Sequence, residues 1–73
     1  MKLPSDVSGR AMQKALERIG FVYQRQKGSH IVLRRDDPYS RVIIPDHKAL
    51  RPGTLRQILN EAGITVQQCM ELL

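Results

Sequence analysis

The segment from Lys27 to Arg34 combines the residue types that chemistry on a phosphate group requires. Within it, His30 follows Gly28 and Ser29 and begins a short alternation of apolar and polar residues. A histidine side chain gains and loses a proton near neutral pH, so it can act as a general acid or base. Glycine lets a backbone approach a phosphate closely, serine can hydrogen-bond it, and the flanking cations can offset negative charge on its oxygens. The segment is therefore a candidate for acid–base chemistry on a phosphodiester.

Cleavage of RNA is the reaction that such a site could perform without a metal ion. The 2′-hydroxyl would lose its proton to His30 and attack the adjacent phosphorus in line, which leaves a 2′,3′-cyclic phosphate and a 5′-hydroxyl. Alternatively, His30 is an exposed strand residue hydrogen-bonded to a neighbour, Gly28 is a turn glycine and Ser29 caps that turn. Residue types and spacing leave both interpretations open.

Further polar residues are candidates for contact with RNA. Arg25, Lys27 and Arg34 lie on expected strands close to His30, and we predict that they bind RNA. His47 falls in an expected loop, where it could transfer a proton, contact a phosphate or bond the loop backbone. Another row of cations repeats every four residues along the first expected helix and could follow a phosphate backbone or form a solvated face: Arg10, Lys14 and Arg18.

Length and charge restrict the class of protein. We expect 73 residues to form one domain, spanning residues 1–73, and the excess of twelve Lys and Arg over seven Asp and Glu favours a polyanionic or acidic partner. The single cysteine, Cys69, excludes an intrachain disulfide and a thiolate metal cluster. No segment approaches the roughly 18 uninterrupted apolar residues of a membrane helix, and the N-terminus lacks the apolar run of a signal peptide. We therefore expect a soluble cytoplasmic protein.

The chain divides into helical and extended segments without a linker. Apolar residues at helical spacing predict a helix that begins after Ser8 and ends at Gly20, and a second one from Pro52 to Gly63. Three extended runs lie between them, at residues 21–27, 30–35 and 41–44, and turn residues predict antiparallel hairpins. Residues 65–68 fit a capping box for a short last helix through residue 73, on which Cys69 is expected to be buried.

This order predicts an α+β fold with the sequence α-β-β-β-α and a short C-terminal helix. Each helix has one apolar stripe, so the helices are expected to cover one face of a three-stranded sheet in a two-layer sandwich. In the second run, Ile31 and Leu33 face the helices, whereas His30, Val32 and Arg34 face the other way. The uncovered face of the sheet is therefore available for a ligand.

Four short motifs carry a resemblance to a known family. They are "LERIGF" at residues 16–21, "KGSH" at 27–30, "IPDH" at 44–47 and "RPGTLRQIL" at 51–59, the last followed by "AGI". Together they resemble the HicA family of toxin mRNA interferases, the small partners of HicB antitoxins, whose fold resembles a double-stranded RNA-binding domain. The resemblance implies metal-independent cleavage of mRNA by one histidine, which corresponds to His30, with no cofactor. It also implies a tightly bound HicB-like antitoxin protein.

Two other functions are compatible with the basic composition. The chain could be a non-catalytic RNA-binding module, or a protein-interaction domain whose basic surface meets an acidic partner. Both explain the cations, but only the ribonuclease interpretation also explains a histidine placed beside them. The resemblance supports His30 alone as the catalyst and leaves the role of His47 open.

Overall fold

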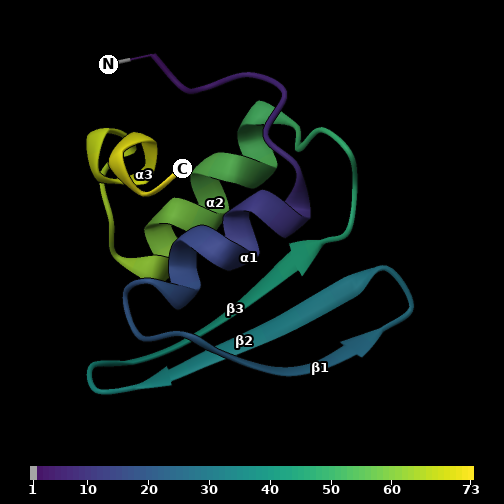
Figure 1. Ribbon diagram of the computed structural model, residues 1–73, viewed down its shortest axis with the longest axis vertical. Coiled ribbons are helices and arrows are strands. Elements are labelled where there is room, and N and C mark those ends of the chain that lie inside the picture. Colours follow the sequence, from purple (N-terminus) through teal and green to yellow (C-terminus); the bar gives the residue numbers. More distant parts are fainter. Residues whose placement is uncertain (1) are drawn as a thin grey trace.

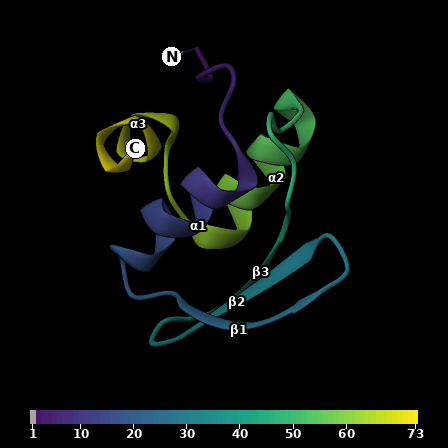
Figure 2. The same cartoon turned by 45° about the vertical axis from the view of Figure 1, so that its right-hand side comes forward.

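The computed structural model describes residues 2–73, which form three strands and three helices. Their bounds are α1 Gly9–Glu17, β1 Val22–Lys27, β2 His30–Asp36, β3 Tyr39–Pro45, α2 Pro52–Ala62 and α3 Val66–Leu72. Figures 1 and 2 show all three helices on one side of the sheet, with the opposite face uncovered. The predicted α+β fold, with the order α-β-β-β-α and a short C-terminal helix, is confirmed. Within residues 2–73, no helix is both long enough and apolar enough to cross a membrane.

The helix ends follow the sequence signals, with one difference. Ser8 caps α1 by accepting a hydrogen bond from the Ala11 N–H at 3.0 Å. The helix ends at Glu17, three residues before the predicted end, because the chain continues through a turn to Gly20, whose φ is +97°. The predicted capping box of α3 is confirmed, since Thr65 and Gln68 each accept a hydrogen bond from the other's backbone N–H.

The sheet has the order β1-β2-β3, and both pairs of strands are antiparallel. The third strand is longer than predicted, because its pairing with β2 runs from Asp36 opposite Tyr39 to His30 opposite Pro45. The turn between these strands has only two residues, and such a tight turn lets pairing begin at once. In β1 the register shifts between Tyr23 and Arg25, which marks a β-bulge.

The core lies between the helices and the inner face of the sheet. Its least exposed large side chains come from every helix and from the two strands β2 and β3: Met12, Leu16, Ile31, Leu33, Val42, Ile44, Leu55, Ile58 and Cys69. The Cys69 Sγ atom lies 3.7 Å from the Met12 Sδ atom, and burial raises the pKa of the Cys69 thiol. Cys69 therefore has the buried, apolar role that its position on the last helix predicts.

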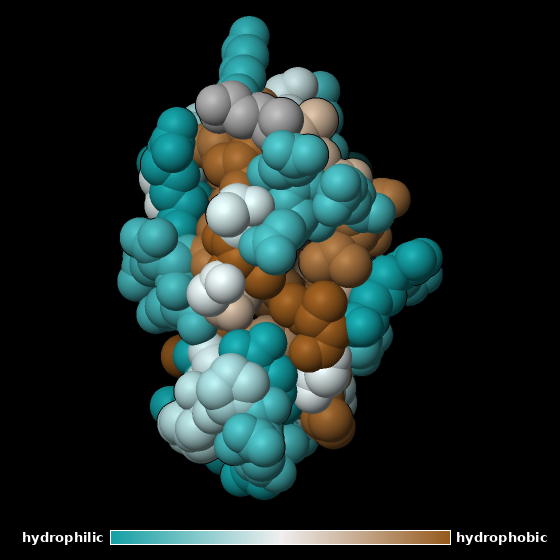
Figure 3. Space-filling view, turned by 90° about the vertical axis from the view of Figure 1, so that its left-hand side faces the viewer, coloured by the Kyte–Doolittle hydropathy of each residue, from teal (hydrophilic) through white to brown (hydrophobic). Residues whose placement is uncertain are grey.

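Apolar side chains reach the surface on the side of the molecule that carries α3. Met70 and Leu73 are each about half exposed there. Figure 3 shows apolar side chains reaching the surface between hydrophilic ones on this side. On the sheet side, described below, the exposed Ile43 lies beside several cations.

Gly9, the first residue of α1, lies directly against Pro45 at the end of β3. A Cβ atom on Gly9 would overlap the backbone carbonyl oxygen of Pro45, and the Gly9 N–H already donates to the His47 carbonyl oxygen at 2.9 Å. We expect Gly9→Ala to lower the free energy of unfolding by about 1–3 kcal/mol, because backbone atoms must move to make room. The matched control is Gly53→Ala in α2, where no atom lies within 4 Å of the added Cβ.

Urea unfolding followed by circular dichroism measures both variants. Gly53→Ala should be neutral or stabilise the fold by up to about 1 kcal/mol, because alanine restricts the unfolded chain more than glycine does. Equal stability of the Gly9→Ala variant and the wild type would show that the α1–β3 contact is loose and would contradict the packing described here.

Candidate active site

The turn between β1 and β2 delivers His30 to the beginning of β2. Gly28 and Ser29 form this two-residue turn, and Lys27 pairs with His30 across it. Gly28 has a φ of +59°, as the first position of a type II′ turn requires, and an added Cβ would meet nothing within 4 Å. Its backbone conformation, rather than lack of space, is therefore what favours glycine at this position.

Cross-strand pairing places four cations on the face of the sheet that carries His30. Lys27 lies opposite His30, and Arg25 lies opposite Val32, whose side chain is on the same face of β2 as His30. In the pairing between β2 and β3, Arg34 lies opposite Arg41. All four cations are exposed on the uncovered face of the sheet. Arg25, Lys27 and Arg34 were predicted from the sequence to lie near His30.

Arg41 is a residue that sequence reasoning missed. The turn residues after β2 could have located it. A two-residue turn between β2 and β3 fixes the register of the two strands and places residue 41 opposite residue 34. The predicted third run began at residue 41 and left its pairing partner open. Once the register is known, Arg41 lies on the same face as His30.

A hollow of about 240 Å³ lies on this face next to His30. Val32, only 6% exposed, and Ile43 supply its apolar residues, and cations stand around it. The complete lining consists of Arg25, Lys27, His30, Val32, Arg41 and Ile43. Such a site can hold a phosphate against the cations and a sugar against the apolar residues. We call it the cationic hollow.

Arg34 is positioned differently from the other three cations. Its Nε atom lies 3.0 Å from an Asp36 carboxylate oxygen, so part of its charge is compensated. It lies beside Tyr39 and Arg41 in a neighbouring hollow of about 380 Å³, which shares Arg25, Val32 and Arg41 with the cationic hollow but does not include His30. The structure therefore brings Arg25 and Lys27 close to His30 and leaves Arg34 four residues further along β2.

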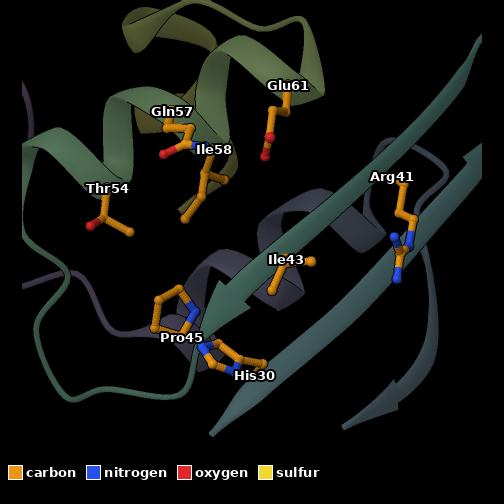
Figure 4. Close-up of a pocket in the computed structure, with 8 residues that line it drawn as sticks. All are labelled: His30, Arg41, Ile43, Pro45, Thr54, Gln57, Ile58 and Glu61. Carbon is orange, nitrogen blue, oxygen red and sulfur yellow. The ribbon is translucent and has the colours of Figure 1, made fainter. Parts of the chain in front are cut away.

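A second, larger hollow of about 410 Å³ lies between β3 and α2. Figure 4 shows Thr54, Gln57, Ile58 and Glu61 extending from α2 toward β3, with His30 and Pro45 at one end of the space and Arg41 near the other. His30, Arg41 and Ile43 line both hollows. The imidazole thus stands on the boundary between them. We call this second space the helix-side hollow.

A polar network behind the turn holds it in place. The Arg10 guanidinium donates to both Asp46 carboxylate oxygens, at 3.2 and 3.1 Å. The Gln26 amide donates to the Asp46 carboxylate at 3.1 Å and to the Gly28 carbonyl oxygen at 3.0 Å. In addition, the Asp46 N–H donates to the Ser29 carbonyl oxygen at 2.6 Å. The loop after β3 is thereby fastened to the turn that precedes His30.

This network changes the interpretation of the cation row on α1. Arg10 is held by Asp46, and these hydrogen bonds with Arg10 and then with Gln26 hold the pKa of the Asp46 carboxyl below its ordinary value of 3.8. The hydrogen bond and the negative charge of Asp46 in turn raise the pKa of Arg10. Arg10 is therefore a positioning residue for the loop, and only Lys14 and Arg18 remain exposed cations of that row without an ion pair among residues 2–73.

The Asp46 network should make stability depend on pH. Because the folded state favours the charged carboxylate, its contribution is complete above pH 3.8 and is lost as pH falls through the lower pKa of the folded protein. We expect Asp46→Asn to lower the urea midpoint at about pH 7, and the difference from wild type to close by about pH 2. Asp6→Asn, which removes an exposed carboxylate without an ion pair among the described residues, should leave the midpoint unchanged at about pH 7. A difference between Asp46→Asn and wild type that is equal at both pH values would contradict this role.

The remaining predicted site residues lie outside the two hollows. Ser29 is exposed in the turn, and its carbonyl oxygen is engaged by Asp46. His47 is exposed in the loop after β3, where its carbonyl oxygen accepts from the Gly9 N–H and its side chain lines neither hollow. In the described part of the chain, no group of three or more His, Cys, Asp or Glu side chains is arranged to hold a metal ion.

Comparison with known families decides the classification. A family described as the HicA toxin of bacterial toxin–antitoxin systems matches residues 9–64. The chain belongs to the HicA toxin family. The match runs from the start of α1 to the residue after Gly63, so it includes every residue that lines the two hollows. Comparison with curated protein sequences finds no match.

Membership confirms the resemblance that the four sequence motifs indicated. HicA toxins are one half of a toxin–antitoxin pair, so a toxin role and a paired antitoxin follow for this chain. The short helix α3 lies outside the matched residues. Within the matched residues, His30 and the cationic hollow combine a titratable side chain with several cations.

Proposed function

We propose that this HicA protein is an mRNA interferase, a metal-independent endoribonuclease that uses His30 as its single catalytic histidine. The observation that carries the proposal is the position of His30, exposed at the edge of the cationic hollow. Within residues 2–73 its imidazole makes no hydrogen bond, so it is not engaged in the structural role that the alternative interpretation requires. A free imidazole beside several cations suits proton transfer on a phosphodiester.

The reaction follows from the chemistry of the groups present. His30 takes the proton of the 2′-hydroxyl, whose oxygen attacks the adjacent phosphorus while the bond from phosphorus to the 5′-oxygen breaks. In-line attack places the leaving oxygen on the far side of the phosphorus, so the exposed site lets water protonate it. The products are a 2′,3′-cyclic phosphate and a 5′-hydroxyl, and no cofactor takes part.

The cations have a role in binding and in the transition state. Lys27 and Arg41 line the cationic hollow with His30 and can offset charge that accumulates on the phosphoryl oxygens. Arg25 and Arg34 extend the positive surface along the strands, where they contact neighbouring phosphates. Gly28 and Ser29 belong to the turn that carries His30, and Ser29 can donate a hydrogen bond to a phosphate.

Control of the toxin requires that this surface be covered. We infer a HicB-like antitoxin protein that presents acidic groups to the cationic hollow and binds tightly in the cytoplasm, where mRNA is found. His47, which lies in the loop fastened to the turn, contacts RNA at the border of this surface rather than transferring a proton.

Cleavage of RNA and matched DNA in excess EDTA tests the proposal. RNA and DNA of the same sequence are incubated with the purified protein, and the expected result is cleavage of RNA alone, because DNA lacks the 2′-hydroxyl. Binding is measured in parallel by fluorescence anisotropy. If the protein binds RNA but does not cut it, the non-catalytic RNA-binding interpretation is correct and the ribonuclease proposal is wrong.

A further inference from the structure

Three polar side chains of the helix-side hollow have no role in the proposed cleavage reaction. Thr54, Gln57 and Glu61 are spaced one helical turn apart along α2 and face β3 across the space (Figure 4). Among residues 2–73, none of their side chains forms a hydrogen bond or an ion pair with another residue. The hydrogen bond from Ser40 reaches only the Glu61 backbone carbonyl oxygen. Gln57 and Glu61 are exposed and Thr54 is half-buried, so all three side chains can reach a ligand in the hollow. A hollow lined by apolar residues and a few convergent polar groups has the composition of a ligand site.

The chemistry of this row does not suit a phosphate. Arg41 lines both hollows, but the Glu61 carboxylate in the helix-side hollow repels phosphate oxygens. The cationic hollow has Arg25 and Lys27 in addition and no carboxylate, so it attracts phosphate more strongly. The helix-side hollow also contains apolar residues, of which Ile58 is 1% exposed and Ile43 is 43% exposed. Its volume of about 410 Å³ is within the range of small-molecule sites. A planar group with hydrogen-bonding edges fits both features.

We propose that the helix-side hollow binds the nucleobase next to the scissile phosphate and favours bases with an exocyclic amino group over uracil. This inference rests on the proposed ribonuclease function, because it uses the position of His30 between the two hollows. With the phosphate in the cationic hollow and the 2′-hydroxyl at His30, the adjoining base is directed toward β3 and α2.

The preference follows from the donors and acceptors along α2. A glutamate carboxylate only accepts hydrogen bonds, so Glu61 pairs with the amino groups of adenine, cytosine or guanine. Uracil has an N–H group, but two carbonyl oxygens flank it and repel a carboxylate. The Gln57 amide both donates and accepts, so it can satisfy a ring nitrogen or a carbonyl oxygen next to the amino group. No Phe, Tyr or Trp lines the hollow, and His30 is assigned to the 2′-hydroxyl, so these hydrogen bonds decide the preference.

The cleavage pattern of the full-length protein tests this inference. A pool of random-sequence RNA is cut by the wild type and by Glu61→Gln, and the ends are sequenced. We expect the wild type to disfavour uracil about 5-fold or more at one position beside the cut. Glu61→Gln should reduce this preference to about 2-fold or less, because an amide can also donate to the uracil oxygens. The matched control, Glu71→Gln on α3, removes the same charge away from the hollow and should keep the wild-type preference.

A binding measurement separates this inference from the ribonuclease proposal. Four 2′-O-methyl trinucleotides, which cannot be cut by attack of the 2′-oxygen, differ only in the central base and are titrated into labelled protein observed by NMR. The amides of Thr54, Gln57 and Glu61 should shift, and uracil should bind most weakly. Shifts confined to the sheet, or equal for all four bases, would overturn the inference. If RNA is not cut but the trinucleotides still discriminate at α2, the ribonuclease proposal fails and the base site stands.

Discussion

Replacing His30 with alanine is expected to slow RNA cleavage at least about 100-fold, since general-base catalysis contributes factors of this size. The side chain is exposed and makes no hydrogen bond among the described residues, so circular dichroism and thermal unfolding should match the wild type. RNA affinity should change little, because the cations rather than the imidazole provide most of the attraction. The measurement is the single-turnover rate on a short RNA with one cleavage site, in excess EDTA.

His47→Ala is the matched control for this prediction. It also removes an exposed histidine, from a loop fastened to the same turn, but its side chain lines neither hollow. We expect its cleavage rate to stay within about 3-fold of the wild type. If His47→Ala lost as much activity as His30→Ala, two histidines would share the proton transfers and the single-histidine mechanism would be wrong.

The second large effect concerns RNA affinity. The double variant Lys27→Ala and Arg41→Ala removes two cations that line the cationic hollow with His30. Each phosphate contact to single-stranded RNA contributes about 0.7 to the slope of log affinity against log salt, so the slope should become shallower by about 1.4. Affinity at low salt should fall at least about 10-fold, measured by anisotropy with 2′-O-methyl RNA, which remains uncut.

A second double variant distinguishes local contact from general attraction. Lys14→Ala and Arg18→Ala removes the same charge from the exposed side of α1, away from both hollows. Its salt slope should remain close to that of the wild type. Equal losses in the two double variants would indicate attraction by net charge alone, and a larger loss from the helix variant would show that RNA follows α1 instead of the sheet.

Much of the fold could be predicted because its signals are local. Ser8, Gly63 and the capping box at Thr65 act within one turn of the helices they begin or end, and the structure confirms each. The alternation of Ile31 and Leu33 with their neighbours likewise assigned the two faces of β2 before any pairing was known. The end of α1 was less predictable, because several turn conformations can connect Glu17 to a glycine three residues later.

The parts of the site that the sequence did not reveal depend on distant residues. Arg10 and Asp46 are separated by 36 positions, and Gln26 and Asp46 by 20, so no local pattern relates them. Arg41 could be assigned to the face of His30 only through the register of β3. The helix-side hollow requires the distance between α2 and β3, which follows from packing of the whole core rather than from any one segment.

The central claim is attack by the 2′-hydroxyl without a metal ion, and the chemical nature of the new RNA ends tests it most directly. RNA is cut by the wild-type protein in excess EDTA, and the fragments are analysed by mass spectrometry. The proposed mechanism predicts a 2′,3′-cyclic phosphate on one fragment and a 5′-hydroxyl on the other. Fragments ending in a 3′-hydroxyl and a 5′-phosphate would show that water attacked the phosphorus and would contradict the role given to His30.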